Sequence, residues 1–218
     1  MKLGHLFAVP LAELRVDDAG PLTAELSELF LARESADGAW RNEIRRDTQH
    51  GALFESRFDL FKWPEAPVRR LAAFCHRAVA SVLKSVSDYP DADFQRLAFD
   101  YHAWFHVTRR GGYQGLHNHQ NATWSGIFCV DPGDDLPDKP QSGAVRFHDP
   151  RGFADQYIDA GNQQLKVTFR HGSYQIRHET GKLLVFPSYL THEVFPYEGE
   201  RPRIVVAFNC WVRLDETP

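Results

Sequence analysis

The sequence predicts a mainly β fold with helices in its N-terminal part, and three observations lead to this prediction. Apolar residues recur at helical spacing in two stretches of the N-terminal half. From Arg96 onward, short runs rich in aromatic and β-branched residues alternate with glycine, proline and aspartate. About seven or eight such runs at this spacing are typical of an antiparallel sandwich, a jelly roll or a barrel.

The length of the chain suits a single domain. Its 218 residues are enough to bury one core, and they contain no internal repeat. We therefore expect one unit over residues 1–218. Residues 1–95 should provide mostly helical and loop support, and residues 96–214 should form the β core.

Two N-terminal stretches, residues 20–38 and 66–86, are expected to be helices because their apolar residues form one stripe each. The stripe of the first contains Leu22, Leu26, Leu29 and Phe30, and that of the second contains Val68, Leu71, Cys75, Val79, Val82 and Leu83. Residues 41–67 show no clear period, and we expect extended chain or loop that covers a sheet.

The expected strands share a high content of aromatic and β-branched residues. They are residues 96–108, 123–131, 143–149, 165–169, 173–177, 182–187 and 203–214. Residues 131–143 are polar and rich in proline, which predicts a surface loop.

Composition narrows the class of partner. The formal net charge is -4, which gives no electrostatic reason to expect nucleic-acid binding, so a small-molecule or protein substrate fits better. Cys75, Cys129 and Cys210 lie far apart and form no CxxC pair, which favours reduced core cysteines and a cytoplasmic location. We expect no secretory signal and no membrane span. A homodimer is compatible with the sequence.

Two histidines one residue apart, His117 and His119, follow a glycine-rich turn. In a strand, side chains at i and i+2 point to the same face, so both rings can converge on one point. His192 follows an apolar strand that ends in a proline turn, and it is the candidate for a third metal ligand. Three imidazoles suit iron, zinc, copper or nickel and keep positions open for substrate or oxygen. The alternative is an ordinary pair of half-exposed histidines.

The wider spacing favours the metal site. Gly111, His117-x-His119, Gly181, Pro187 and His192 together reproduce most of the two-part cupin pattern. The usual glutamate after the HxH is missing. The fourth ligand of that pattern is therefore not expected here.

Arg203 stands eleven residues after His192, at the start of a very apolar expected strand. A buried guanidinium fork binds a carboxylate through two parallel hydrogen bonds. The alternative interpretation is that Arg203 is an exposed residue of a turn, beside Arg201 and Glu200. We prefer Arg203 to Arg201 as a carboxylate-binding group because its strand can turn the side chain inward.

These motifs together resemble a bacterial family of oxygenases that depend on 2-oxoglutarate and Fe(II). The resemblance covers residues 104–209 and rests on the runs HNHQNATWSGIFCV, SGAVRFHDPR and GKLLVFPSYLTHEVFPYEGERPRIVVAFN. It implies a double-stranded β-helix, a cupin-like jelly roll, with N-terminal helices packed against one side. It also implies that His117, His119 and His192 hold Fe(II) and that Arg203 holds 2-oxoglutarate. O2 would then be used to hydroxylate a substrate, with release of succinate and CO2.

One feature departs from the wider superfamily, in which the second ligand is a carboxylate. His119 takes that position here, so the metal centre is one unit more positive. A histidine also fills the space that related halogenases leave for a halide, so halogenation is not expected. Two alternative functions stay open: a three-histidine dioxygenase or isomerase that needs no 2-oxoglutarate, and a non-catalytic metal- or ligand-binding jelly roll.

Several neighbouring residues are candidates for contacts in the site. Trp104 can form a wall of it, and Asn121 and Asn209 can hydrogen-bond the cosubstrate or a ligand histidine. Core packing for Trp104, a turn for Asn121 and a strand edge for Asn209 are the ordinary readings. We do not expect His148 to be a ligand, and we expect His178 to be exposed near a hairpin tip.

Overall fold

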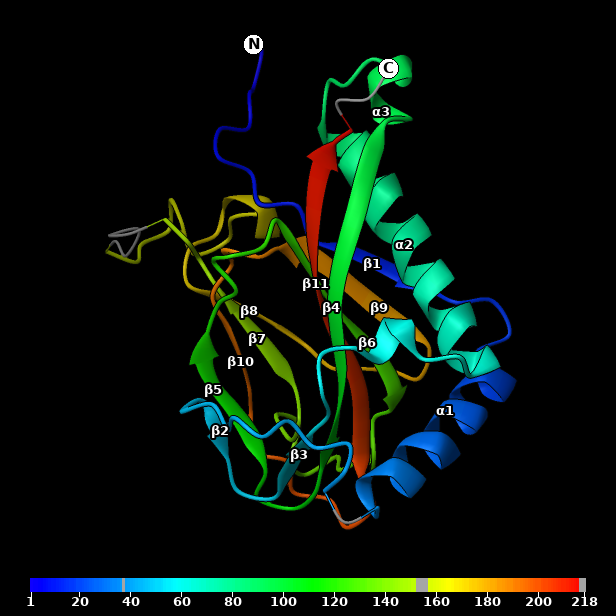
Figure 1. Ribbon diagram of the computed structural model, residues 1–218. Coiled ribbons are helices and arrows are strands. Elements are labelled where there is room, and N and C mark those ends of the chain that lie inside the picture. The colour runs from blue at the N-terminus through cyan, green and yellow to red at the C-terminus, as the bar shows by residue number, and fades with distance from the viewer. Residues whose placement is uncertain (37, 152–156, 216–218) are drawn as a thin grey trace.

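In a computed structural model of the protein, two antiparallel β-sheets face each other and helices cover the outer face of the larger sheet (Figure 1). The structure describes residues 1–36, 38–151 and 157–215. The ladders that join neighbouring strands in both sheets are antiparallel. The arrangement is a jelly roll with N-terminal helices, so the predicted fold class is confirmed.

The larger sheet has six strands, and two of them are long. In order across the sheet the strands are β1 (Ala12–Arg15), β9 (Lys182–Pro187), β6 (Trp124–Asp131), β11 (Arg203–Leu214), β4 (Leu97–Thr108) and β3 (Leu53–Glu55). Strands β4 and β11 pair over their full lengths, from Leu97 opposite Leu214 to Thr108 opposite Arg203. Arg203 is thereby fixed at the same end of the sheet as Thr108.

The smaller sheet has five short strands. In order they are β2 (Gln49–His50), β5 (Tyr113–His117), β10 (His192–Val194), β7 (Val145–His148) and β8 (Ser173–Ile176). Figure 1 shows this sheet facing the lower halves of β4 and β11, while the upper halves of both long strands rise beyond it. One end of the larger sheet is therefore not covered by a second β layer.

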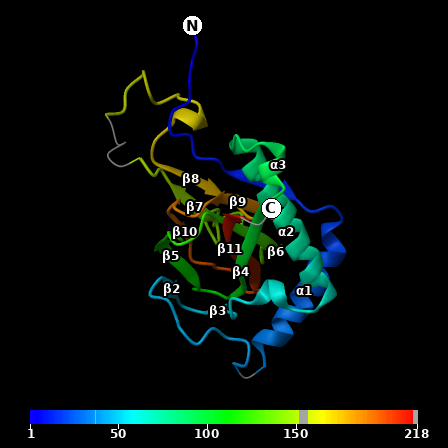
Figure 2. The same ribbon diagram turned by 45° about the horizontal axis from the view of Figure 1, so that its top comes forward.

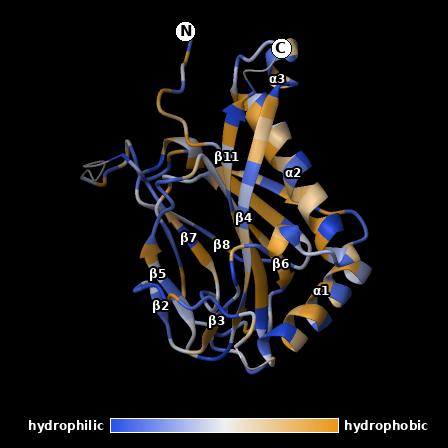
Figure 3. Cartoon of the chain, in the orientation of Figure 1, coloured by the Kyte–Doolittle hydropathy of each residue, from blue (hydrophilic) through white to orange (hydrophobic). Residues whose placement is uncertain are grey.

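Helices α1 (Ala19–Glu34) and α2 (Ala66–Val86) pack against the outer face of the larger sheet (Figure 2). Phe30 of α1 stacks on Phe105 of β4 with ring centroids 4.3 Å apart, and Phe74 of α2 contacts Phe128 of β6 edge to face at 6.2 Å. Figure 3 shows apolar residues on these helices and on the strands behind them. Removing this apolar surface from water stabilises the layer by about 1.5–3 kcal/mol for each fully buried large side chain.

The pleat of β4 separates the core from the site. Ala103, Phe105 and Val107 belong to the helix-covered core, whereas the alternating Trp104 and His106 line a pocket between the sheets. The same sequence alternation therefore builds the hydrophobic core on one face and a polar pocket on the other.

Most expected elements are present, with several differences, and strands β1, β5 and β10 were not among the expected ones. Residues 165–169 do not form a strand: Val167–Phe169 are a 3-10 turn (η2), and Val167 is 58% exposed, so its apolar pattern has no sheet to pair with. Residues 41–67 contribute β2, β3 and a 3-10 turn, Leu60–Lys62 (η1), rather than loop alone. A short helix, Asp91–Phe94 (α3), was not expected.

No helix in the described part of the chain is long and apolar enough to cross a membrane. All three cysteines are free and buried. Burial raises the pKa of Cys129 and of Cys210 to about 12, so these thiols stay protonated and unreactive at neutral pH. The division at residue 95 stays a prediction.

Candidate metal centre

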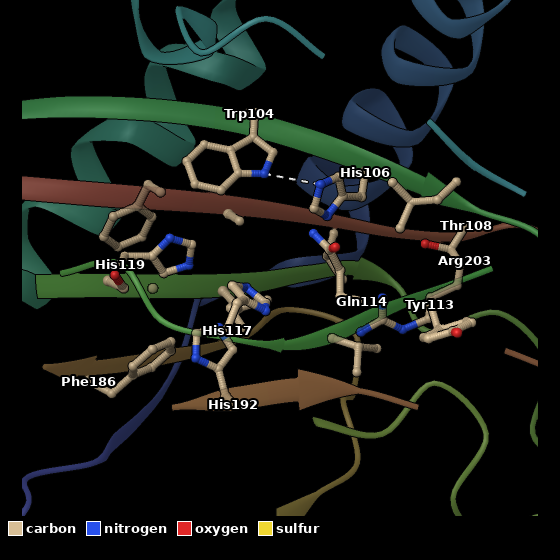
Figure 4. A pocket seen from close by; sticks show the side chains of 18 residues that line it. Trp104, His106, Thr108, Tyr113, Gln114, His117, His119, Phe186, His192 and Arg203 are labelled. Atoms are coloured by element: carbon tan, nitrogen blue, oxygen red, sulfur yellow. Dashed lines mark hydrogen bonds between the residues drawn. The ribbon is translucent and has the colours of Figure 1, made fainter. Parts of the chain in front are cut away.

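Three histidines from two parts of the chain, the HNH segment and the start of β10, meet between the sheets (Figure 4). His117, His119 and His192 each offer a ring nitrogen, and these atoms lie within 4.8 Å of one another. His117 and His192 are direct partners in the β5–β10 ladder, so both rings stand on the same face of the smaller sheet. Their ring centroids are 4.4 Å apart.

His119 reaches the same point by a different route from the expected one. Strand β5 ends at His117, so simple alternation along a strand does not place His119. Its backbone N–H instead donates to the Ser188 carbonyl at 2.8 Å. This bond ties the HNH segment to the FPS segment that follows β9, and the His119 ring lies 5.0 Å from that of His117.

The hydrogen bonds of two rings show which nitrogen is free. Nδ1 of His117 is 2.7 Å from the Gly115 carbonyl, and Nδ1 of His192 is 2.9 Å from the Leu190 carbonyl. Because a carbonyl can only accept, each Nδ1 carries the proton and each Nε2 keeps its lone pair. Metal-ligating histidines are usually oriented in this way, so the residues present fit a metal ion.

The electrostatics of the three rings favour their neutral form. Burial lowers the pKa of His117, and burial together with His117 lowers that of His119 to about 3. The pKa of His192 lies well below its ordinary value because the ring is fully buried beside the other two. Neutral imidazoles are the form that binds metal, so no proton has to leave at neutral pH.

Arg203 lines the same pocket, and its side chain is almost completely buried, with 3% of the residue exposed. It donates from Nη2 to Nδ1 of His178 at 2.9 Å, and among the described residues it has no carboxylate partner. Figure 4 shows Thr108 and Tyr113 beside it. A buried cation without a counter-charge is costly, and such a group is typical of a site for an anionic ligand.

The expectation that His178 is exposed is wrong. It is 7% exposed because its ring packs against Arg203 and accepts the hydrogen bond from the guanidinium. Gly143 makes room for the arginine stem: a Cβ at this position, where φ is +63°, would lie 2.9 Å from Arg203 Cδ. The sequence shows Gly143 in the SGAV run, but it does not show that this glycine lies against Arg203.

A second polar cluster lies beside the histidines. His106 Nε2 is 3.1 Å from Trp104 Nε1 and 2.9 Å from Glu55 Oε2. Burial acts to raise the pKa of Glu55, but His106 and Asn42 lower it further, so this group is a carboxylate. The Trp104 N–H donates to His106 Nε2, so Trp104, His106 and Glu55 form one hydrogen-bonded chain along the pocket. Glu55 was not identified from the sequence.

The remaining candidates lie at different distances from the pocket. Trp104 lines it and contacts the His119 ring at 6.0 Å. Asn209 accepts from Ser125 at 2.8 Å, and exposed Asn121 accepts from Trp211 through its backbone carbonyl. Neither asparagine lines the pocket, and their roles toward the cosubstrate stay predictions. His148 hydrogen-bonds Glu193 instead of joining the triad.

The pocket has the lining of a small-molecule site. Apolar and aromatic side chains line it together with a few convergent polar groups, and it opens to solvent. Figure 4 shows the three histidines on one side, Arg203 with Tyr113 on the other, and Gln114 between them. The fold and the site together define a jelly roll with a three-histidine pocket and a buried arginine.

Comparison with known proteins places this chain in a family. Residues 102–209 match the model of the family described as "Putative 2OG-Fe(II) oxygenase", and this half of the chain contains the three histidines and Arg203. The protein belongs to the 2-oxoglutarate- and Fe(II)-dependent oxygenases, an enzyme family that uses Fe(II), 2-oxoglutarate and O2. The resemblance to oxygenases that depend on 2-oxoglutarate and Fe(II) is confirmed, while a bacterial origin stays a prediction.

Solved structures show the same fold at low sequence identity. A prolyl-4-hydroxylase from Pseudomonas putida is 15% identical, with a TM-score of 0.62 and coverage of 94% of this chain and 92% of that one. HygX from Streptomyces hygroscopicus, solved with nickel, 2-oxoglutarate and hygromycin B, is 13% identical, with a TM-score of 0.58 and coverage of 94% and 83%.

A prolyl hydroxylase from Trichoplax adhaerens, in complex with a hypoxia inducible factor peptide, is 10% identical. Its TM-score is 0.58, and the alignment covers 92% of this chain and 83% of that one. No curated protein matches the sequence.

Proposed function

We propose that His117, His119 and His192 bind Fe(II) and that Arg203 binds the distal carboxylate of 2-oxoglutarate, in an enzyme that hydroxylates its substrate. The observation that carries this proposal is the buried guanidinium of Arg203, which lines the same pocket as three neutral imidazoles and lacks a carboxylate partner in the described chain. Iron and 2-oxoglutarate supply the oxidising chemistry when bound: O2 is reduced, succinate and CO2 leave, and one oxygen atom enters the substrate.

The residues of this chain orient and enclose the reactants. The carbonyls of Gly115 and Leu190 hold two imidazoles with Nε2 toward the metal. Phe186, Val194 and Val205 line the pocket with apolar surface, which excludes water and strengthens the electrostatic contacts inside.

The charge balance explains how a histidine can replace the usual carboxylate. Three neutral ligands leave the full 2+ charge on Fe(II), and the two carboxylates of 2-oxoglutarate offset it. Arg203 adds one positive charge, and the Glu55 carboxylate offsets one. With Fe(II) bound and 2-oxoglutarate absent, the pocket would carry a net positive charge, which favours binding of the dianionic cosubstrate.

An anaerobic titration tests the proposal. Protein loaded with Fe(II) is titrated with 2-oxoglutarate while the visible absorbance is followed, and chelation of iron by the keto acid should produce a charge-transfer band. The control is the His192→Ala variant, which should give no band. Absence of the band in the wild-type protein at millimolar 2-oxoglutarate would refute the proposal and favour a three-histidine enzyme that does not use the cosubstrate.

We also propose a cytoplasmic enzyme with a small-molecule or protein substrate and no nucleic-acid partner. Three reduced, buried cysteines and the net charge of -4 support this. A homodimer is compatible with it, and light scattering of the purified protein measures the oligomeric state.

A further inference from the structure

A continuous row of aromatic side chains leads outward from the metal centre. We call it the aromatic shelf, and it consists of Phe58, His102, Trp104 and Trp211. Trp104 contacts the ligand His119 at 6.0 Å and Phe58 at 4.9 Å. Phe58 stacks on His102 at 6.4 Å, and His102 contacts Trp211 edge to face at 4.7 Å.

The shelf runs from the pocket toward the uncovered end of the larger sheet. His102 and Trp104 alternate along β4, with Trp104 in the pocket, and Trp211 lies on the neighbouring strand β11. Figure 1 shows that the ends of both strands rise beyond the smaller sheet. His102 is exposed, and Phe58 and Trp211 are half-buried. Apolar rings left open next to a reactive centre are typical of a substrate-binding surface.

The Trp211 ring is held in place. Its Nε1 donates to the backbone carbonyl of Asn121, a residue of the same loop that carries His119. Trp104 is held by its contacts with Phe58 and His119. Trp211 therefore presents a fixed, half-buried ring on which a planar ligand can stack with little cost in side-chain ordering, and Trp104, which is 6% exposed, offers a small part of its ring at the inner end of the shelf.

Arg46 adds a positive charge to the rim of the shelf. Its guanidinium carbon lies 5.6 Å from the centroid of the Phe58 ring. It is exposed, and within the described ranges of the chain it forms no ion pair.

The carboxylates near the shelf are engaged elsewhere. Asp100, one step further along β4, pairs with Arg213 at 2.9 Å, and Asp59 accepts from the Trp63 indole at 3.0 Å. Glu55 pairs with His106. The Trp63 donor is neutral, so Asp59 keeps its negative charge, and Arg46 is the cation that contacts the shelf.

We propose that the aromatic shelf and Arg46 bind the primary substrate, and that this substrate is a small molecule with a planar ring system and an anionic group. The ring stacks on Trp211 and Trp104, and the anion pairs with Arg46. This inference rests on the proposed function, because it places the stacked ring next to the metal ligand His119. An extended peptide is the competing occupant, but it would leave Arg46 without a defined partner.

The experiment uses the full-length protein loaded anaerobically with Fe(II) and 2-oxoglutarate, and calorimetry measures the binding of four probes. The probe 2-naphthoate is planar and anionic. Its controls are 2-naphthylmethylammonium, which is planar and cationic, cyclohexanecarboxylate, which is anionic and not planar, and a blocked Gly-Pro-Gly peptide. We expect 2-naphthoate to bind most tightly, with an affinity that falls as salt is added.

Three variants locate the binding site. Trp211→Leu should weaken 2-naphthoate binding roughly 2- to 10-fold, and Trp211→Phe should recover most of the loss because it restores a ring. Arg46→Gln should remove most of the salt dependence. The matched control is Arg69→Gln. It makes the same charge change at an exposed residue of α2, the helix on the outer face of the larger sheet, and this variant should bind 2-naphthoate like the wild type.

The inference is overturned if 2-naphthoate does not bind at millimolar concentration, or if the cationic probe or the peptide binds as tightly. It is also overturned if Trp211→Leu and Arg46→Gln both behave like Arg69→Gln. Failure of the proposed function is seen separately, as a missing charge-transfer band in the wild-type protein. A protein that shows the band but does not distinguish the probes refutes only this inference.

Discussion

Replacing Arg203 with methionine should weaken 2-oxoglutarate binding without destabilising the protein in the absence of the cosubstrate. Methionine keeps a long unbranched stem in the space beside Gly143 and removes only the guanidinium. The guanidinium is buried and donates to His178, and it has no ion pair in the part of the chain that the structure describes. Its removal therefore affects a ligand contact and leaves no native carboxylate unpaired.

Loss of the guanidinium should lower the affinity for 2-oxoglutarate but should not lower the stability of the protein. Hydrogen bonds to charged groups contribute about 1.5–3 kcal/mol each, so loss of the carboxylate contact should weaken 2-oxoglutarate binding roughly 10- to 150-fold. Desolvation of an unpaired buried cation costs several kcal/mol. Removal of the Arg203 guanidinium should therefore leave the free energy of unfolding unchanged or raise it by about 1–3 kcal/mol. The lost hydrogen bond to His178 offsets part of this gain.

Anaerobic titration of the charge-transfer band gives the dissociation constant, and urea unfolding of the metal-free protein gives the stability. The control is Arg201→Met, because Arg201 is exposed and pairs with Asp131, so its loss should change neither quantity beyond about 0.5 kcal/mol. An unchanged affinity for Arg203→Met would show that another cation binds the cosubstrate. A loss of stability by 3 kcal/mol or more would show that Arg203 has an internal partner.

Further predictions concern the neighbours of the site and the core. His178→Phe should weaken 2-oxoglutarate binding about 3- to 10-fold by freeing the guanidinium, with unchanged iron content measured by metal analysis; equal affinity would contradict a positioning role. Burial lowers the folded-state pKa of the three ligand histidines, so the unfolded chain binds more protons below pH 6.5. The metal-free protein should thus lose about 1.4 kcal/mol per pH unit for each of His119 and His192 as pH falls from 6.5 toward 4.5, and a flat unfolding profile would contradict this. Phe105→Ala should reduce the free energy of unfolding by about 3–5 kcal/mol in urea titrations, because the ring fills the layer under Phe30. Gly126→Ala should reduce it by about 1–3 kcal/mol, since the new Cβ would lie 2.3 Å from Phe208 Cζ, and a neutral result would show that this ring can move.

Much of the fold follows from local sequence pattern. The stripe in residues 66–86 predicts α2 with its bounds, because an amphipathic helix needs only one apolar face. The strand pattern of residues 203–214 likewise matches β11. Residues 165–169 have the same composition but form no strand, because a strand also needs a neighbour to pair with, and this is not encoded locally.

The site was predictable where spacing carries the chemistry. The HNH pair, His192 and Arg203 stand out in the sequence because their residue types and separations are those of a metal- and carboxylate-binding jelly roll. His178 and Glu55 do not stand out, because each acquires its role only from a partner distant in the chain, Arg203 in one case and His106 in the other. Whether the three histidines bind iron stays a prediction that the anaerobic titration decides.

By itself the sequence determined the alternation that turns one face of β4 toward the helices and the other toward the pocket, and it determined which residue types meet there. Only the tertiary structure decided that His119 joins the triad through a bond to Ser188, beyond the end of β5. The structure alone also left the aromatic shelf open, because the short strands of the second sheet do not reach the ends of β4 and β11. The pairing of strands and the coverage of one sheet by the other depend on contacts between distant segments, and a local sequence pattern does not specify these contacts.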